Sequence, residues 1–99
     1  MTKVELPRSI QKAISRAVRE CEPEKVVLYG SRARGDNHPV SDFDLAFYGV
    51  RNLGAWHEFA ADMAYEPPSL FELDVVRIEA VSPELRAAIE RDGKVVYQR

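Results

Sequence analysis

Apolar residues recur along the chain with helical spacing in some stretches and in extended runs in others. The first stretch predicts a helix with one apolar stripe, formed by Ile10, Ala13, Ile14, Ala17, Val18 and Cys21. Glu22-Pro23 ends this helix, because the residue before a proline is disfavoured in the helical conformation. Residues 25–29, "KVVLY", then read as a strand that is covered on both faces.

The rest of the chain continues the alternation of strands and helices. Residues 43–48, 70–78 and 94–98 are predicted strands. A helix between the first two of these buries Trp56, Phe59, Ala60, Met63 and Ala64 and stops before Pro67-Pro68. Ser82 caps a last helix with Pro83 at its first position, and that helix buries Leu85, Ala88 and Ile89 before it stops at Gly93.

This order of elements predicts an α/β (α+β) fold in which a small mixed β-sheet has helices packed on it. With only 99 residues, and with no repeat or linker, we expect residues 1–99 to form a single domain. Within these residues we expect the sheet and its helices to use the whole sequence and to leave no segment for a second wall of a substrate pocket. We therefore expect another polypeptide, either a second copy of the chain or a different protein, to supply an acceptor.

A glycine-rich turn separates the first two predicted strands. Gly30-Ser31 begins a short helical turn that Gly35 closes, and the polar loop 36–41 follows. The spacing G-x-x-x-x-G fails as a Walker A loop, because Asp36 and Asn37 stand where lysine and serine or threonine are required. It also fails as a Rossmann motif, since Arg32 occupies the second glycine position. Gly30 nevertheless allows an anion to approach the backbone, and the Ser31 hydroxyl can donate to a phosphate oxygen.

Three acidic residues accompany this turn. Asp42 and Asp44 lie two residues apart at the start of a strand, so both side chains point to one face. Asp74 interrupts an otherwise apolar strand, which is costly for a residue without a partner. If the two strands are neighbours, the three carboxylates can hold Mg²⁺ in a two-metal site. Together with the Gly-Ser turn, they describe transfer at a nucleotide phosphate.

Composition narrows the setting of this chemistry. The net charge of −2 provides no excess of positive charge for a nucleic-acid partner. Cys21 is the only cysteine, which fits a reducing cytoplasm and a buried, unreactive thiol. No stretch has the length of a membrane span, and the first residues lack the apolar core of a signal peptide. We expect a cytoplasmic protein without a membrane partner.

The segment "GSRARGDNHPVSDFDLA", residues 30–46, resembles the G-S-x-A-R-G…S-D-x-D-L signature of the DNA polymerase β-like nucleotidyltransferases. The small size is similar to that of the minimal nucleotidyltransferase (MNT) branch. Every signature position is filled, and the resemblance extends from the first strand to Asp74, about half of the chain. It implies the polymerase β-like nucleotidyltransferase fold and the activity of an adenylyltransferase-type enzyme.

The resemblance also implies roles for single residues. Gly30 and Ser31 would bind the triphosphate of ATP, and Asp42 and Asp44 would bind both metals. Asp74 would bind one metal and help to activate the attacking hydroxyl. Many MNT proteins are antitoxins encoded beside a HEPN-domain toxin, and some attach AMP to that partner. On this resemblance the chain would transfer AMP to a hydroxyl of a HEPN-type toxin.

Several alternatives stay open at the level of sequence. Arg34 either reaches a phosphate or braces Asp42 or Asp44 from behind, and Asp74 could instead form a structural ion pair with an arginine. Arg32 is interpreted as a solvated helix residue. For the whole protein, the alternatives are an antitoxin that acts by binding alone and a nucleotidyltransferase for a small molecule of the aminoglycoside type.

Overall fold

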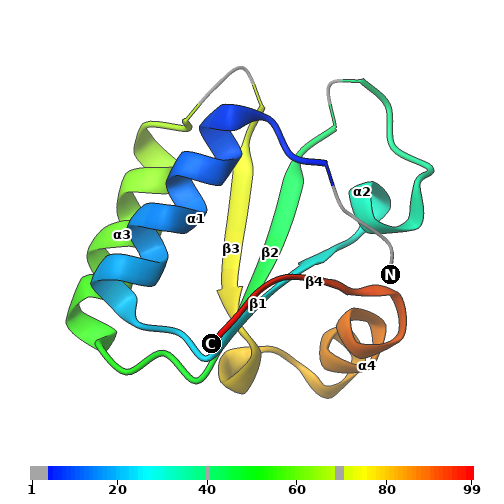
Figure 1. The fold of residues 1–99 in the computed structure, drawn as a ribbon. Helices are drawn as coiled ribbons and strands as arrows, with labels where there is room; N and C mark the ends of the chain where they lie inside the picture. The colour runs from blue at the N-terminus through cyan, green and yellow to red at the C-terminus, as the bar shows by residue number, and fades with distance from the viewer. Residues whose placement is uncertain (1–4, 40, 69–70) are drawn as a thin grey trace.

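A mixed β-sheet with helices on both faces forms the fold (Figure 1). The computed structural model describes residues 5–39, 41–68 and 71–99. Within these residues the elements are α1 (Arg8–Cys21), β1 (Lys25–Tyr29), α2 (Ser31–Arg34), β2 (Phe43–Tyr48), α3 (Leu53–Tyr65), β3 (Leu73–Arg77), the 3₁₀-helix η1 (Ile78–Ala80), α4 (Pro83–Asp92) and β4 (Lys94–Gln98). The predicted fold class is confirmed.

The strands of the described sheet lie in the order β3-β2-β1-β4. β1 pairs antiparallel with both β2 and β4, whereas β2 and β3 are parallel. The parallel pair is connected through α3, as parallel strands require a crossover. Its register places Asp44 directly opposite Asp74. The expectation that these two strands are neighbours is therefore confirmed.

α1 and α3 form a layer on one face of the sheet (Figure 1). Phe47 of β2 is fully buried beneath this layer, with its ring centroid 5.0 Å from that of Trp56 and 5.8 Å from that of Phe59. Cys21 is also fully buried, and burial raises the pKa of its thiol. The predicted stripe of α1 and the core role of α3 are confirmed. None of the described helices has the length and apolar character needed to cross a membrane.

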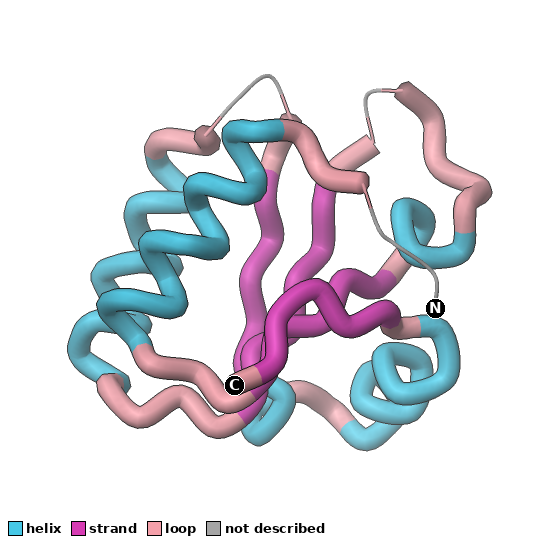
Figure 2. The backbone as a smooth tube through the Cα atoms, in the orientation of Figure 1, coloured by secondary structure: helices cyan, strands magenta, loops and turns pink. Residues whose placement is uncertain are grey.

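α4 and η1 lie on the other face, so that the strands run between two helical layers (Figure 2). Ile89 of α4 is fully buried against Val27, Ala46 and Ile78. The Ser82 side chain accepts a hydrogen bond from the Leu85 amide at the start of α4, which confirms the predicted cap. This face of β2 also carries Asp44, beyond the part that α4 covers.

Some predicted boundaries and burials differ from the structure. The third strand is Leu73–Arg77 rather than residues 70–78, because Ile78 turns into η1 and is buried there; Leu70 lies outside the described residues. Ala64 is exposed rather than buried, since it points away from the sheet near the end of α3. In α4 only Ile89 is buried, whereas Leu85 and Ala88 are half-buried.

Gly93, at the junction of α4 and β4, has no room for a side chain. A Cβ atom there would overlap the Ile89 carbonyl oxygen and the Val27 side chain. We expect Gly93→Ala to lower the free energy of unfolding by about 1–3 kcal/mol, as overpacking does. Gly54→Ala is the matched control, because its Cβ would meet only Asn52 Oδ1, at 3.6 Å. Urea denaturation tests the pair, and an unchanged midpoint for Gly93→Ala would contradict this packing.

Candidate active site

The Gly-Ser turn lies directly beside one of the predicted acids. β1 ends at Tyr29, Gly30 has φ +76°, and α2 begins at Ser31. At this φ a side chain would be strained, and a Cβ atom would lie 2.5 Å from Asp44 Oδ2 and would displace that carboxylate. The conformation and the contact together explain why the turn has a glycine at this position.

Asp44 and Asp74 project from the same face of the sheet, because residues that are opposite in a parallel pair share a face. Asp42 precedes β2 by one residue and is half-buried, as is Asp44, whereas Asp74 is exposed. Tyr29 of β1 is the partner of Asp44 on its other side. The structure therefore places Asp44 beside the Gly-Ser turn and Asp74 opposite Asp44, with Asp42 two residues before Asp44.

Burial and the charges of its neighbours both disfavour the ionised form of Asp44. The pKa of Asp44 is raised to about 6, first by burial and then by the charges of Asp74 and Asp42, and the charge of Arg34 opposes this increase. The Tyr29 phenol has its pKa raised to about 12, first by burial and then by the charges of Asp44 and Asp74. Like charges and partial burial thus oppose ionisation at the centre of this group.

No basic side chain neutralises the three carboxylates directly. Within the described residues, the side chains of Asp42, Asp44 and Asp74 form no ion pair and no hydrogen bond. The alternative that Asp74 forms a structural ion pair with an arginine is therefore wrong for this part of the chain. Uncompensated, partly buried carboxylates are a donor set that suits a hard divalent cation.

The carboxylates are not already arranged around one ion. In the described parts of the chain, no three His, Cys, Asp or Glu side chains converge closely enough to hold a metal. The register places Asp44 opposite Asp74, and carboxylate oxygens are ligands that suit Mg²⁺. Binding such an ion with all three acids would require rotation of their side chains, which the exposure of Asp74 allows.

The two arginines of the turn have different contacts from those expected. Arg34 is 46% exposed and pairs with Asp36 at 3.1 Å and with Asp92 at 3.8 Å, so it does not brace Asp42 or Asp44 by direct contact. Arg32 is not a solvated helix residue. It donates hydrogen bonds to the carbonyl oxygens of Pro39 and Ser41.

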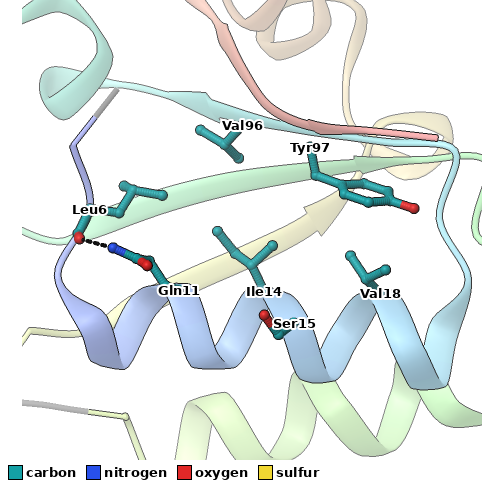
Figure 3. Close-up of a pocket in the computed structure, with 7 residues that line it drawn as sticks. All are labelled: Leu6, Gln11, Ile14, Ser15, Val18, Val96 and Tyr97. Carbon is teal, nitrogen blue, oxygen red and sulfur yellow. Dashed lines mark hydrogen bonds between the residues drawn. The ribbon is translucent and has the colours of Figure 1, made fainter. Parts of the chain in front are cut away.

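A cavity of about 360 Å³ lies elsewhere, between α1 and β4 (Figure 3). Ile14 and Val18 of α1 face Val96 and Tyr97 of β4 across it, and Gln11 donates a hydrogen bond of 2.6 Å to the Leu6 carbonyl oxygen at one end. Its described lining includes no charged side chain. Since it is on the α1 face of the sheet and the three acids are on the other, it does not belong to the candidate site.

Comparisons with solved structures agree with this arrangement. A toxin–antitoxin complex with AMP-PNP contains a chain that superposes with a TM-score of 0.65 at 22% identity, over 93% of this chain and 73% of that one. A chain assigned as a minimal nucleotidyltransferase gives a TM-score of 0.63 at 25% identity, over 88% of this chain and 87% of that one. The complex of the tri-AMPylated HEPN toxin of Shewanella oneidensis with its MNT antitoxin gives 0.56 at 19% identity, with coverages of 93% and 69%. These likenesses support the fold.

A search of the curated proteins found no match. The family model "Polymerase beta, Nucleotidyltransferase", in contrast, matches residues 11–99, which include the Gly-Ser turn and all three acids. The match extends over nearly the whole chain, and the described fold has the sheet that the motif requires. The chain therefore belongs to the polymerase β nucleotidyltransferase family.

Proposed function

We propose that this nucleotidyltransferase transfers AMP from ATP to a hydroxyl group of a partner protein in a Mg²⁺-dependent reaction, as the antitoxin of a HEPN-type toxin. The observation that carries the proposal is the position of Asp44. It lies against the Gly30 backbone on one side and opposite Asp74 on the other, and no basic side chain of the described residues pairs with it. A triphosphate held at the turn would place its phosphates next to the acids.

Asp42, Asp44 and Asp74 would hold the metal ions. When bound, Mg²⁺ neutralises the carboxylates and the phosphates and polarises the reacting α-phosphate. This role fits the raised pKa of Asp44, because a cation among the three acids would favour its ionised form. Mg²⁺ and nucleotide are therefore expected to bind together.

The chain's own residues would act as follows. Gly30 and Ser31 hold the triphosphate, and Asp74 accepts the proton of the acceptor hydroxyl. The hydroxyl oxygen forms a bond to the α-phosphorus while the bond from the α-phosphorus to the bridging oxygen breaks, so that pyrophosphate leaves. Asp74 suits the proton-accepting role because it is the exposed member of the three acids, at the edge strand β3.

Arg34 would bind a phosphate after it leaves its present partners. Both partners of its ion pair with Asp36 are exposed, where such pairs contribute little stability, and its pair with Asp92 is long, at 3.8 Å. A charge-assisted, two-pronged contact with a phosphate would be stronger. Arg34 can therefore exchange its partners at small cost.

The solved structures support the choice of partner. One similar chain comes from a toxin–antitoxin complex with AMP-PNP, and another from a complex of a tri-AMPylated HEPN toxin with its MNT antitoxin. A non-catalytic antitoxin that neutralises its toxin by binding is the rival function. Three uncompensated acids beside the turn argue against this rival, since binding alone does not require them.

The first prediction from the proposed function concerns the free energy that the ionised form of Asp44 costs the folded protein. Its pKa is raised from 3.8 to about 6, so between these values the folded protein holds a proton that the unfolded chain releases. Stability therefore falls as the pH rises through this window. In EDTA, Asp44→Asn should raise the free energy of unfolding near neutral pH by on the order of 1 kcal/mol, after allowance for solvent screening, and the gain should vanish towards about pH 4.

Denaturation at several pH values measures this effect. Asp62→Asn is a suitable control, because it removes a surface ion pair with Arg16 and should give no such gain. A loss of stability in Asp44→Asn near neutral pH would contradict the repulsion described above.

The second prediction concerns metal and nucleotide together. Without Mg²⁺ the three acids repel a triphosphate, so ATP should bind weakly, and Mg²⁺ should strengthen its binding about tenfold or more. Asp44→Asn should remove most of this metal dependence and leave the fold intact, because it deletes charge at nearly constant volume. Calorimetry with and without Mg²⁺ measures both effects. Equal ATP affinity of the unchanged protein in the two conditions would rule out the metal assignment.

The third prediction separates enzyme from binder. Asp74→Asn should abolish addition of AMP to the partner yet retain much of the nucleotide binding, because it removes help in the transition state more than it removes ground-state contacts. Ser31→Ala should instead weaken nucleotide binding.

Co-expression with the partner, followed by growth and by the intact mass of the partner, provides the measurement. Full protection by Asp74→Asn with no adduct on the partner would show that binding alone neutralises it. An adduct on a small molecule but not on the partner would instead support the alternative of a nucleotidyltransferase for a small molecule of the aminoglycoside type.

A further inference from the structure

Arg32, the second residue of α2, binds the backbone immediately before β2. Its Nε and Nη2 donate to the Ser41 carbonyl oxygen at 3.1 and 2.8 Å, and Nη2 also donates to the Pro39 carbonyl oxygen at 3.0 Å. The Ser41 carbonyl belongs to the peptide bond that continues into Asp42. One guanidinium therefore fixes the orientation of the peptide plane immediately before Asp42, which is the first of the proposed metal ligands.

The same guanidinium packs against two aromatic rings. Its central carbon lies 4.3 Å from the ring centroid of Phe43 and 5.1 Å from that of Phe71. The rings themselves meet edge to face, with centroids 5.5 Å apart and an interplanar angle of 81°. Phe43 is 3% exposed and lies between Asp42 and Asp44 in the sequence. Because side chains alternate along a strand, a fixed ring on one face orients both acids on the other.

A third connection reaches the strand that carries Asp74. The Phe43 amide donates a hydrogen bond of 3.0 Å to the Glu72 carbonyl oxygen, just before β3. Arg32 thus contacts the segments on both sides of this bond and is itself adjacent to Ser31. The turn, the start of β2 and the start of β3 all meet at one side chain.

We propose that Arg32 is a positioning residue, which holds Asp42 and Asp44 in place relative to Ser31 and Asp74 so that the acids can share Mg²⁺ with a nucleotide. It acts through the Ser41 carbonyl and the Phe43 ring and does not touch the nucleotide. The inference rests on the proposed function, and it assigns a role to the position that is left unspecified in the signature G-S-x-A-R-G.

Only arginine can make this set of contacts. Its planar fork presents several N–H groups in fixed directions and can stack on aromatic rings at the same time, whereas the lysine ammonium is a point charge on a flexible stem. Lysine keeps the positive charge, so Arg32→Lys distinguishes geometry from charge. If Arg32 served as a charge for the phosphates, lysine would replace it.

The experiment compares the full chain with Arg32→Lys, Arg32→Met and Phe71→Leu. Arg86→Lys is the matched control, because Arg86 is exposed on α4 and pairs only with Glu90 among the described residues. Two properties are measured for each protein: the affinity for AMP-PNP with Mg²⁺ and with EDTA, by calorimetry, and the amide hydrogen exchange of peptides that contain residues 41–44. Thermal melting shows whether each variant is folded.

We expect Arg32→Lys and Arg32→Met to lose most of the gain in AMP-PNP affinity that Mg²⁺ provides, about tenfold, as changes in residues that orient metal ligands do. Amide exchange at 41–44 should become faster in both, while exchange in α1 stays unchanged. Phe71→Leu should change both properties in the same direction but less, and Arg86→Lys should change neither. If Arg32→Met does not fold, Arg32→Lys and Phe71→Leu still give the comparison.

Three results would overturn the inference. Unchanged Mg²⁺ dependence and exchange in Arg32→Lys would remove the positioning role and leave the proposed function intact. Normal behaviour of Arg32→Lys with loss in Arg32→Met would show that Arg32 acts by charge. Absence of Mg²⁺-dependent binding in the unchanged protein would remove the proposed function, and the inference with it.

Discussion

The parallel register between β2 and β3 is the constraint on which the site depends. It places Asp44 opposite Asp74. Because side chains alternate between the two faces of β2, Phe43, Leu45 and Phe47 then lie in the core on the other face. A shift of one residue would turn the acids into the core and the aromatic rings into solvent. The packing of α1 and α3 on one face therefore determines where the carboxylates lie on the other.

This register brings like charges together at a cost that the core can offset. Neighbouring strands are about 4.8 Å apart, and two charges at that distance repel by about 3 kcal/mol at an effective dielectric constant of 20. Burial of each large apolar side chain contributes about 2 kcal/mol in the opposite direction. The three large buried residues of β2, Phe43, Leu45 and Phe47, thus offset the repulsion, so the sheet can keep the acids adjacent without a basic residue between them.

The sequence was sufficient for those features that depend on local pattern. The stripe of α1, the Ser82 cap and the strands 25–29 and 43–48 follow from spacing and from capping chemistry, and all are observed. The end of β3 could not be predicted in this way, because Ile78 is apolar in either state and is buried by η1 rather than by a strand. Whether Ile78 continues the strand or turns into η1 depends on its packing with Ile89 of α4, which is a tertiary interaction.

The same distinction applies within the site. The acids and the Gly-Ser turn could be identified because their residue types and spacing are themselves the chemical signal, whereas Arg32 looked like an exposed arginine on a short helix. Its partners are two backbone carbonyls, which carry no residue-type signal, and two aromatic rings, of which Phe71 is 39 positions away in the sequence. A residue that orients the ligands of a site, unlike one that is a ligand, is therefore visible only once the loop and both strands have been placed. That is why a residue that orients the acids of this site is not one of those that the motif specifies.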